Sequence, residues 1–322
     1  MIFRKPLKNV LSVVTLLVAL LVSSASHAEQ QRVDETKAAQ ADGTVRINVV
    51  RGEISIEGWN RNEVMVKGLL DEELEEFIFD VDGAETGIEV RIPRNNSSWH
   101  NRDETDLVIH VPENSNIAFR GVSVDVDANR VRGNVEIGVV SGDVDANGGT
   151  ERIVLQTVSG DIDVREVTGR IKVKTVSGDI ESYNSVGESI YGTVSGDILV
   201  EGGGEDLKVE TVSGDIEILR TDFVDVSGHS VSGDVDVRGN LKPKGVVEFD
   251  NVSGSIRLGL QGTVNARIDL ETGSGSIRNR LSDDKPKASK YVRDESLRFT
   301  LGDGTGEIVL STRSGDISVS NR

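Results

Sequence analysis

The tetrapeptide Val-Ser-Gly-Asp recurs along the chain at an almost constant interval. Its serine falls at positions 141, 159, 177, 195, 213 and 232, so the first four intervals are 18 residues and the fifth is 19. Degenerate copies of the motif extend the pattern in both directions, beginning at Val50, Val122, Val252, Gly273 and Arg313. A fixed period kept over this length is typical of a solenoid, in which each repeat packs on the next.

Each period divides into two halves of nine residues with the same polarity pattern. Residues 158–166 read "VSGDIDVRE" and residues 167–175 read "VTGRIKVKT", and both halves carry apolar side chains at their fifth and seventh positions. This alternation indicates a strand of about five residues followed by a tight turn. We therefore predict an all-β fold, a parallel β-solenoid with about 18 residues and two strands per coil, its coils about 4.8 Å apart.

Each residue of the motif has an expected place in such a coil. The first-position valines (the Val158 column) and the fifth-position isoleucines (the Ile162 column) should point into the core. Glycine supplies the backbone freedom that a corner needs, and Ser and Asp suit turns because their side chains bond nearby backbone groups. Threonines at 157, 175, 193 and 211 should form a hydroxyl ladder at the other corner.

The segments outside the repeat predict targeting and capping. Residues 1–28 contain three cations, an apolar stretch of 13 residues and small residues before position 28, which is typical of a cleaved secretory signal peptide. Irregular β structure at both ends of the solenoid should protect its open edges. The other predicted segments are a disordered leader (29–43), an N-terminal cap of irregular coils (44–121), the regular repeat (122–281), and a loop with closing strands (282–322).

Composition narrows the classes of partner. The formal charge is −18, and it becomes −21 when the three cations of the signal peptide are removed. Such a charge repels nucleic acid and anionic lipid, whereas it suits cations, basic proteins and neutral glycans. The chain has no cysteine, which excludes disulfides, thiolate metal sites and cysteine catalysis. We predict an exported protein, periplasmic or extracellular, that does not insert into the membrane after signal cleavage.

The repeat and the first coil together resemble a bacterial family. "VSGDI" at 18-residue intervals and "GEISIEGWNRNEVMV" at residues 52–66 are similar to the β-strand-repeat family called “putative adhesin”, over roughly residues 44–322. The resemblance implies a β-solenoid that is exported or attached to the membrane in the bacterial cell envelope. It implies no catalytic residue, because none is established for that family.

The candidate site that the sequence defines best is an array of aspartates at the fourth and sixth positions of three successive coils. By alternation these side chains lie on one outward face, and neighbouring coils place like charges about 5 Å apart, which is unfavourable unless a cation bridges them. Calcium takes six to eight oxygen ligands. "DVDANG" at Asp143 begins like a calcium loop, but its twelfth residue is Val154 instead of Glu. The alternative is solvated aspartates bonded within turns. The candidate calcium ligands are Asp125, Asp127, Asp143, Asp145, Asp161 and Asp163.

Two tryptophans and one cationic segment are candidate contact surfaces. Trp59 follows the first coil and Trp99 lies in the polar stretch "RNNSSWHNRDE". Each can stack on a sugar or a protein partner, and each can equally cover the end of the core. The cations between Arg278 and Arg293 form either a solvated loop or a docking site for an acidic partner.

No motif indicates catalysis. The chain lacks a Gly-x-Ser-x-Gly elbow and a His-Glu-x-x-His helix, and Ser282 and Lys285 form an isolated Ser-x-x-Lys. With 54 acidic residues, a glycosidase-like pair cannot be singled out. We predict a non-enzymatic interaction, scaffold or adhesin-like protein of the cell envelope that binds an envelope protein or a glycan and needs no cofactor. The alternatives are a calcium-stabilised, glycan-binding adhesion module and a polysaccharide-acting enzyme.

Overall fold

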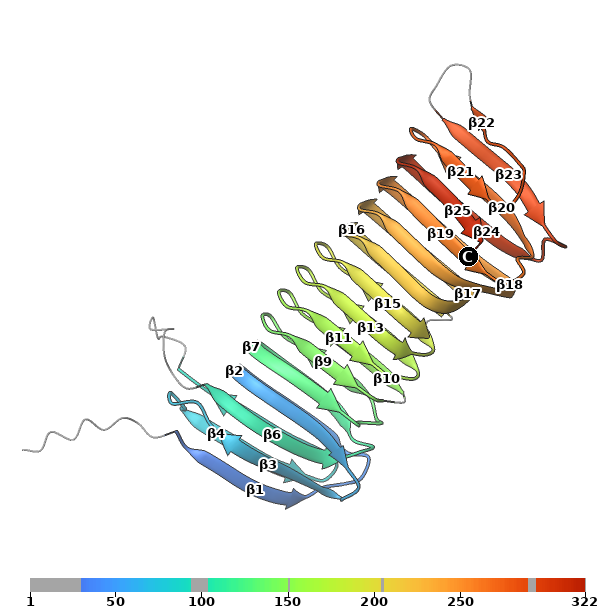
Figure 1. Cartoon of the computed structure of the whole chain (residues 1–322). Helices are drawn as coiled ribbons and strands as arrows, with labels where there is room; N and C mark the ends of the chain where they lie inside the picture. The colour runs from blue at the N-terminus through green and yellow to red at the C-terminus, as the bar shows by residue number, and fades with distance from the viewer. Residues whose placement is uncertain (1–29, 94–103, 150, 204–205, 289–293, 322) are drawn as a thin grey trace, which may run out of the picture.

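The computed structural model describes residues 30–93, 104–149, 151–203, 206–288 and 294–321. Within these ranges the regular structure is entirely β, with 25 strands joined in one hydrogen-bonded sheet. The strands are stacked side by side along the long axis of the molecule (Figure 1). The prediction of an all-β fold with mostly parallel pairing is confirmed. The predicted signal peptide lies outside the described residues, and none of those residues form a helix long and apolar enough to cross a membrane.

The repeat folds into two parallel ladders. Each strand pairs with the strand 18 residues further along, as Ile153 does with Ile171 and Ile162 with Ile180. Ladder A contains β8 (Val135–Gly138), β10 (Arg152–Gln156), β12 (Arg170–Lys174), β14 (Glu188–Gly192) and β16 (Asp206–Ser213). Ladder B contains β9 (Val144–Asn147), β11 (Ile162–Arg165), β13 (Ile180–Ser185) and β15 (Ile198–Gly203).

The N-terminal end is built by strands that are not in sequence order. The long strand β2 (Thr44–Trp59) lies between β7 (Asn116–Asn129) on one side and β5 (Glu85–Arg91) and β6 (Thr105–Pro112) on the other. Antiparallel strands then close this end. These are β1 (Arg32–Ala38), β3 (Glu63–Leu69) and β4 (Glu76–Asp82).

The predicted disordered leader is wrong in its central part. Residues Arg32–Ala38 form β1, which pairs antiparallel with β3 over its whole length. Val33 is buried there, although its neighbours along the strand are polar. β1 forms although the segment is polar because it pairs with the edge of β3. Without it, that edge would expose a row of unpaired backbone groups.

The C-terminal end also departs from sequence order. β17 (Ile216–Ser232) and β18 (Val235–Ser253) each run through both ladders, and β19 (Ile256–Gln261) follows in ladder B. The last two strands of the chain are inserted before the end of the stack, β24 (Gly306–Ser314) between β18 and β20 (Ala266–Thr272), and β25 (Ile317–Asn321) between β19 and β21 (Ile277–Arg280). Antiparallel β23 (Glu295–Leu301) and β22 (Lys287–Ala288) cover β20.

The core follows the predicted isoleucine column but not the predicted valine column. Ile162, Ile180, Ile198 and Ile216 are at most 1% exposed, whereas Val158 is 46% exposed. The cause is alternation, because the strand that buries Ile171 and Val173 continues to bury Thr175 and so turns Val176 outward. The first-position valines therefore lie on the surface.

The predicted hydroxyl ladder is wrong in its partners. The threonines at 157, 175, 193 and 211 are buried, but each donates its hydroxyl proton to a glycine carbonyl of the motif, as Thr157 does to Gly142 at 3.3 Å. This bond satisfies a backbone acceptor at the Val-Ser-Gly-Asp corner itself.

Candidate functional site

The Val-Ser-Gly-Asp corner is held together by its glycine and its aspartate. Gly160 has a φ of +149°, and a Cβ atom on it would lie 2.0 Å from the carbonyl oxygen of Gly142 in the preceding coil. The Asp143 Oδ1 atom accepts a hydrogen bond from the backbone N–H of Asp161 at 2.8 Å. The same bond joins the fourth-position aspartates of six successive pairs of coils, from Asp125 to Asp234. The aspartates are therefore part of the corner's construction.

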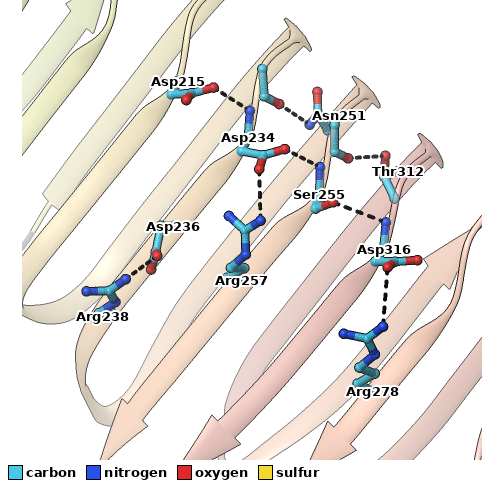
Figure 2. Close-up of polar contacts among 12 residues, drawn as sticks. Asp215, Asp234, Asp236, Arg238, Asn251, Ser255, Arg257, Arg278, Thr312 and Asp316 are labelled. Atoms are coloured by element: carbon cyan, nitrogen blue, oxygen red, sulfur yellow. Dashed lines mark hydrogen bonds and ion pairs between the residues drawn. The ribbon is translucent and has the colours of Figure 1, made fainter.

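The carboxylate ladder continues into the C-terminal coils (Figure 2). Asp234 accepts a hydrogen bond from the Ser255 N–H, and Asp316 accepts bonds from both the N–H and the hydroxyl of Ser276, all at 2.8–2.9 Å. These donors to Asp316 hold the pKa of its carboxyl below the usual range, because they stabilise the charged form. The ladder thus links coils that are neighbours in space and distant in sequence.

Beside this ladder lies an exposed row of valines, which we call the valine column. Its side chains are 37–51% exposed, one per coil over eight coils. At about 4.8 Å per coil the row is roughly 34 Å long. The valine column consists of Val122, Val140, Val158, Val176, Val194, Val212, Val231 and Val252. The signal that could have revealed it is the unbroken alternation through the buried threonines.

The six predicted calcium ligands divide into two kinds. Asp125, Asp143 and Asp161 each use one oxygen to bind the backbone of the next coil. The other three are paired in register on neighbouring strands of ladder B, in the order Asp127, Asp145, Asp163.

The register pairing perturbs the middle carboxyl. Burial, followed by the charges of Asp127 and Asp163, raises the pKa of Asp145 to about 6. Asp163 is paired with Arg165 at 2.8 Å through one oxygen, and its other oxygen is buried without a partner. Among the described residues no cluster of three or more acidic or histidine side chains has an arrangement suited to a metal ion. Calcium binding by this array stays a prediction.

Of the two tryptophans, the structure describes only Trp59. Trp59 is partly buried, its indole N–H donates to the carbonyl oxygen of Glu63 at 2.8 Å, and its ring centroid lies 4.9 Å from that of His110. The guanidinium of Arg61 lies 4.9 Å from the same ring. Trp99 lies outside the described residues. The contact role of both tryptophans stays a prediction.

Arg51 and Glu73 line a cleft of about 990 Å³ at the N-terminal end, and Arg51 forms a buried ion pair that the sequence did not predict. Arg51 donates two hydrogen bonds to Asp71, at 2.5 and 2.8 Å, and a third to Glu73 at 3.3 Å. The Asp71 carboxylate is fully buried, and its bond raises the pKa of Arg51. Arg51 lies on β2 and Asp71 in the loop between β3 and β4, twenty residues apart, so no local motif pointed to them. Arginines and glutamates line the cleft in equal numbers, which leaves it without a dominant charge.

Comparisons with known proteins place the chain in a family. The family model described as Toastrack DUF4097 matches residues 24–320. No curated protein matches the chain significantly.

Solved structures align over most of the chain at low identity. A “putative cell adhesion protein” from Clostridium sporogenes is 13% identical over 91% of this chain and 100% of that chain, with a TM-score of 0.20. A “putative adhesin” from Bacteroides fragilis is 13% identical over 91% and 98%, with a TM-score of 0.34. A “putative lipid binding protein” from Parabacteroides distasonis is 10% identical over 89% and 96%, with a TM-score of 0.33.

Proposed function

This chain belongs to the Toastrack DUF4097 family, and we propose that it is a non-enzymatic interaction protein. It is exported, acts in the bacterial cell envelope as an adhesin-like scaffold, and is built of 18-residue coils of two strands each. Its partner is an envelope protein that contributes an extended segment with apolar side chains flanked by basic ones.

The valine column carries this proposal. Burial of the core does not require these side chains, since the isoleucines and threonines fill the inward positions. A contiguous apolar row on a surface marks a site of contact with another molecule more often than scattered apolar residues do. A straight row suits an extended partner, because solenoids offer long contact surfaces in place of a pocket.

The charge beside the column selects the partner's chemistry. In each regular coil the valine is followed two residues later by glycine and three residues later by the ladder aspartate, so a line of carboxylates runs parallel to the apolar row. Lysine or arginine side chains of a partner would meet these carboxylates while its apolar side chains cover the valines. A neutral glycan can hydrogen-bond to the carboxylates, but it carries no positive charge to pair with them.

Site-specific photo-crosslinking in the producing cell tests the proposal. A photoreactive phenylalanine analogue is placed at Val158 or Val194 in the column, or at Lys172 on the outward face of ladder A as the control. We expect the same protein adduct, identified by mass spectrometry, from both column positions and none from the control position.

A matched variant separates binding from folding. Replacement of Val140, Val176 and Val212 by Thr removes apolar surface while retaining the branched shape and β propensity, so the fold should persist. Loss of the adduct in this variant supports the valine column as the contact surface. Equal adducts from the column and from Lys172, or an adduct that survives the triple replacement, would contradict it, and a glycan adduct would favour the glycan-binding alternative.

A further inference from the structure

The outward face of ladder B changes its sign of charge along the molecule. Near the N-terminal end its rungs carry Asp127, Asp145 and Asp163. At the C-terminal end the rungs that continue the same column carry Arg257 and Arg278, with a serine between them. This arginine cluster has the opposite sign to the chain's formal charge of −18.

Four arginines surround a floor of small residues. Ser318 is paired in register with Arg257 on one side and Arg278 on the other. Ser320 is paired in the same way with Gly259 and Arg280. A hollow of about 200 Å³ lies over this floor. We call it the arginine hollow, and its lining includes Arg238, Arg257, Arg278, Arg280, Asp236, Gly259, Ser318 and Ser320.

Three of the four arginines contact aspartates (Figure 2). Arg238 is held by Asp236, and Arg257 is held by Asp234 at 2.9 Å. Arg278 is 69% exposed and lies 3.8 Å from Asp316, at the limit of an ion pair. Arg280 forms no ion pair with the residues that the structure describes. Within the described part of the chain, Arg280 is therefore without an ion pair, Arg278 is held only by a long one, and the other two guanidiniums are positioned by their aspartates.

A purely protective role explains only part of this arrangement. β21 pairs with β25 alone among the described strands, and charged side chains on an edge strand keep other chains from adding to it. Edge protection accounts for Arg278 and Arg280. It does not account for Arg257 and Arg238 on the opposite side of the floor, nor for the small residues between the two pairs.

We propose that the arginine hollow binds the phosphate group of a small phosphorylated molecule. Guanidinium groups bind phosphate oxygens in pairs with matched geometry, and serine hydroxyls donate to the remaining oxygens. The volume suits one such group, since whole drug-sized ligands occupy about 300–1,000 Å³. The chain has a formal charge of −18, so nucleic acid and anionic membranes, which carry many charges, are repelled more strongly than a single phosphate group.

Calorimetric titration of the full chain tests the site with inorganic phosphate and with glucose 6-phosphate as probes. We expect saturable binding of at least one probe, and we expect the variant R278Q/R280Q to weaken it by about tenfold or more. The control variant R152Q/R170Q removes two exposed arginines that are paired on ladder A and should leave the affinity unchanged. Tighter binding of glucose 6-phosphate identifies a phosphate ester as the ligand, and tighter binding of inorganic phosphate identifies the free ion.

Three outcomes would overturn the proposal. They are no saturable binding of either probe, equal weakening by the two double variants, and binding only to vesicles that contain phosphatidic acid. Circular dichroism of R278Q/R280Q shows whether its fold is intact, and R278K/R280K, which keeps the charge but not the forked donors, should bind more weakly than the native chain. The test is independent of the valine column, because replacement of Val140, Val176 and Val212 by Thr should leave phosphate binding unchanged.

Discussion

At the scale of single residues, the fourth-position aspartate is a link between coils. One carboxylate oxygen accepts the N–H of the equivalent residue in the next coil, at 2.7–2.9 Å along the regular repeat. This hydrogen bond to the backbone explains why Asp recurs at the fourth position of the repeat. The explanation requires no catalytic role for the carboxylate.

Replacement of Asp179 tests this link. Asp179→Ala leaves the N–H of Asp197 without its acceptor and should lower the free energy of unfolding by about 1 kcal/mol, as measured by urea denaturation. Asp179→Asn keeps a side-chain oxygen in place and should lose less. Lys172→Ala, an exposed change on ladder A, is the control. An alanine variant as stable as the native chain would show that the bond contributes nothing.

The raised pKa of Asp145 predicts a pH dependence of stability. Its folded pKa of about 6 lies above its ordinary value of 3.8, so the folded chain binds more protons than the unfolded chain between these values. This carboxyl's contribution therefore destabilises the fold progressively as the pH rises from about 4 to 6. Asp145→Asn should be more stable than the native chain at pH 7 and no more stable below pH 4. Denaturation midpoints at the two pH values measure the difference.

The same carboxyl reports on calcium. A bound cation favours the charged form of a carboxyl, so calcium at the aspartate array should lower the pKa of Asp145 in an NMR titration. An unchanged titration curve in saturating calcium would contradict the predicted site.

At the scale of elements, the close stacking of corner glycines sets the coil geometry. Gly160→Ala forces a Cβ atom against the Gly142 carbonyl in a backbone conformation that L side chains rarely adopt, and it should cost roughly 1–3 kcal/mol from the conformation alone. Gly192→Ala is the matched control, because the nearest atom to its Cβ would be 3.8 Å away. Thermal unfolding should show a large loss for the first variant and little change for the second. Similar melting temperatures would mean that adjacent coils do not approach this closely.

The N-terminal cap depends on its buried ion pair. Arg51→Ala leaves the buried carboxylate of Asp71 without its partner and should cost about 3–5 kcal/mol. Replacing both residues together, as Arg51→Met with Asp71→Leu, removes the unpaired charge and should recover much of that loss. Urea denaturation measures both variants, and a double variant no better than Arg51→Ala would show that the charge is not the cause.

The elements that could be predicted from sequence are those that local periodicity determines. The isoleucine column follows from alternation within one strand, and the coil spacing follows from the repeat. Their apolar character alone predicts that the valines point inward, whereas the strand's alternation, which runs through the buried threonines, turns them outward. The arginine hollow combines residues 238, 257, 278 and 280, which come from three strands and meet only because β25 lies between β19 and β21.

At the scale of the whole molecule, both ends of the stack are closed by strands out of sequence order. β2 is inserted next to β7, and the last strands of the chain are inserted next to β18 and β19. Antiparallel strands then cover the N-terminal end and, at the C-terminal end, strand β20, while β21 remains an edge among the described strands (Figure 1). No repeat spacing indicates such insertions, because the pairing is set by contacts between distant segments. The result is a long stack whose regular middle presents the valine column.

The outward orientation of the valine column is the central claim, and thiol labelling tests it most directly. The chain has no cysteine, so Val176→Cys and Ile180→Cys each introduce a single thiol four residues apart. Val176 is 44% exposed and Ile180 is fully buried, so under native conditions a thiol reagent should modify the first variant rapidly and the second only after unfolding. Protection of Val176→Cys together with rapid labelling of Ile180→Cys would contradict the orientation of the column and, with it, the proposed binding surface.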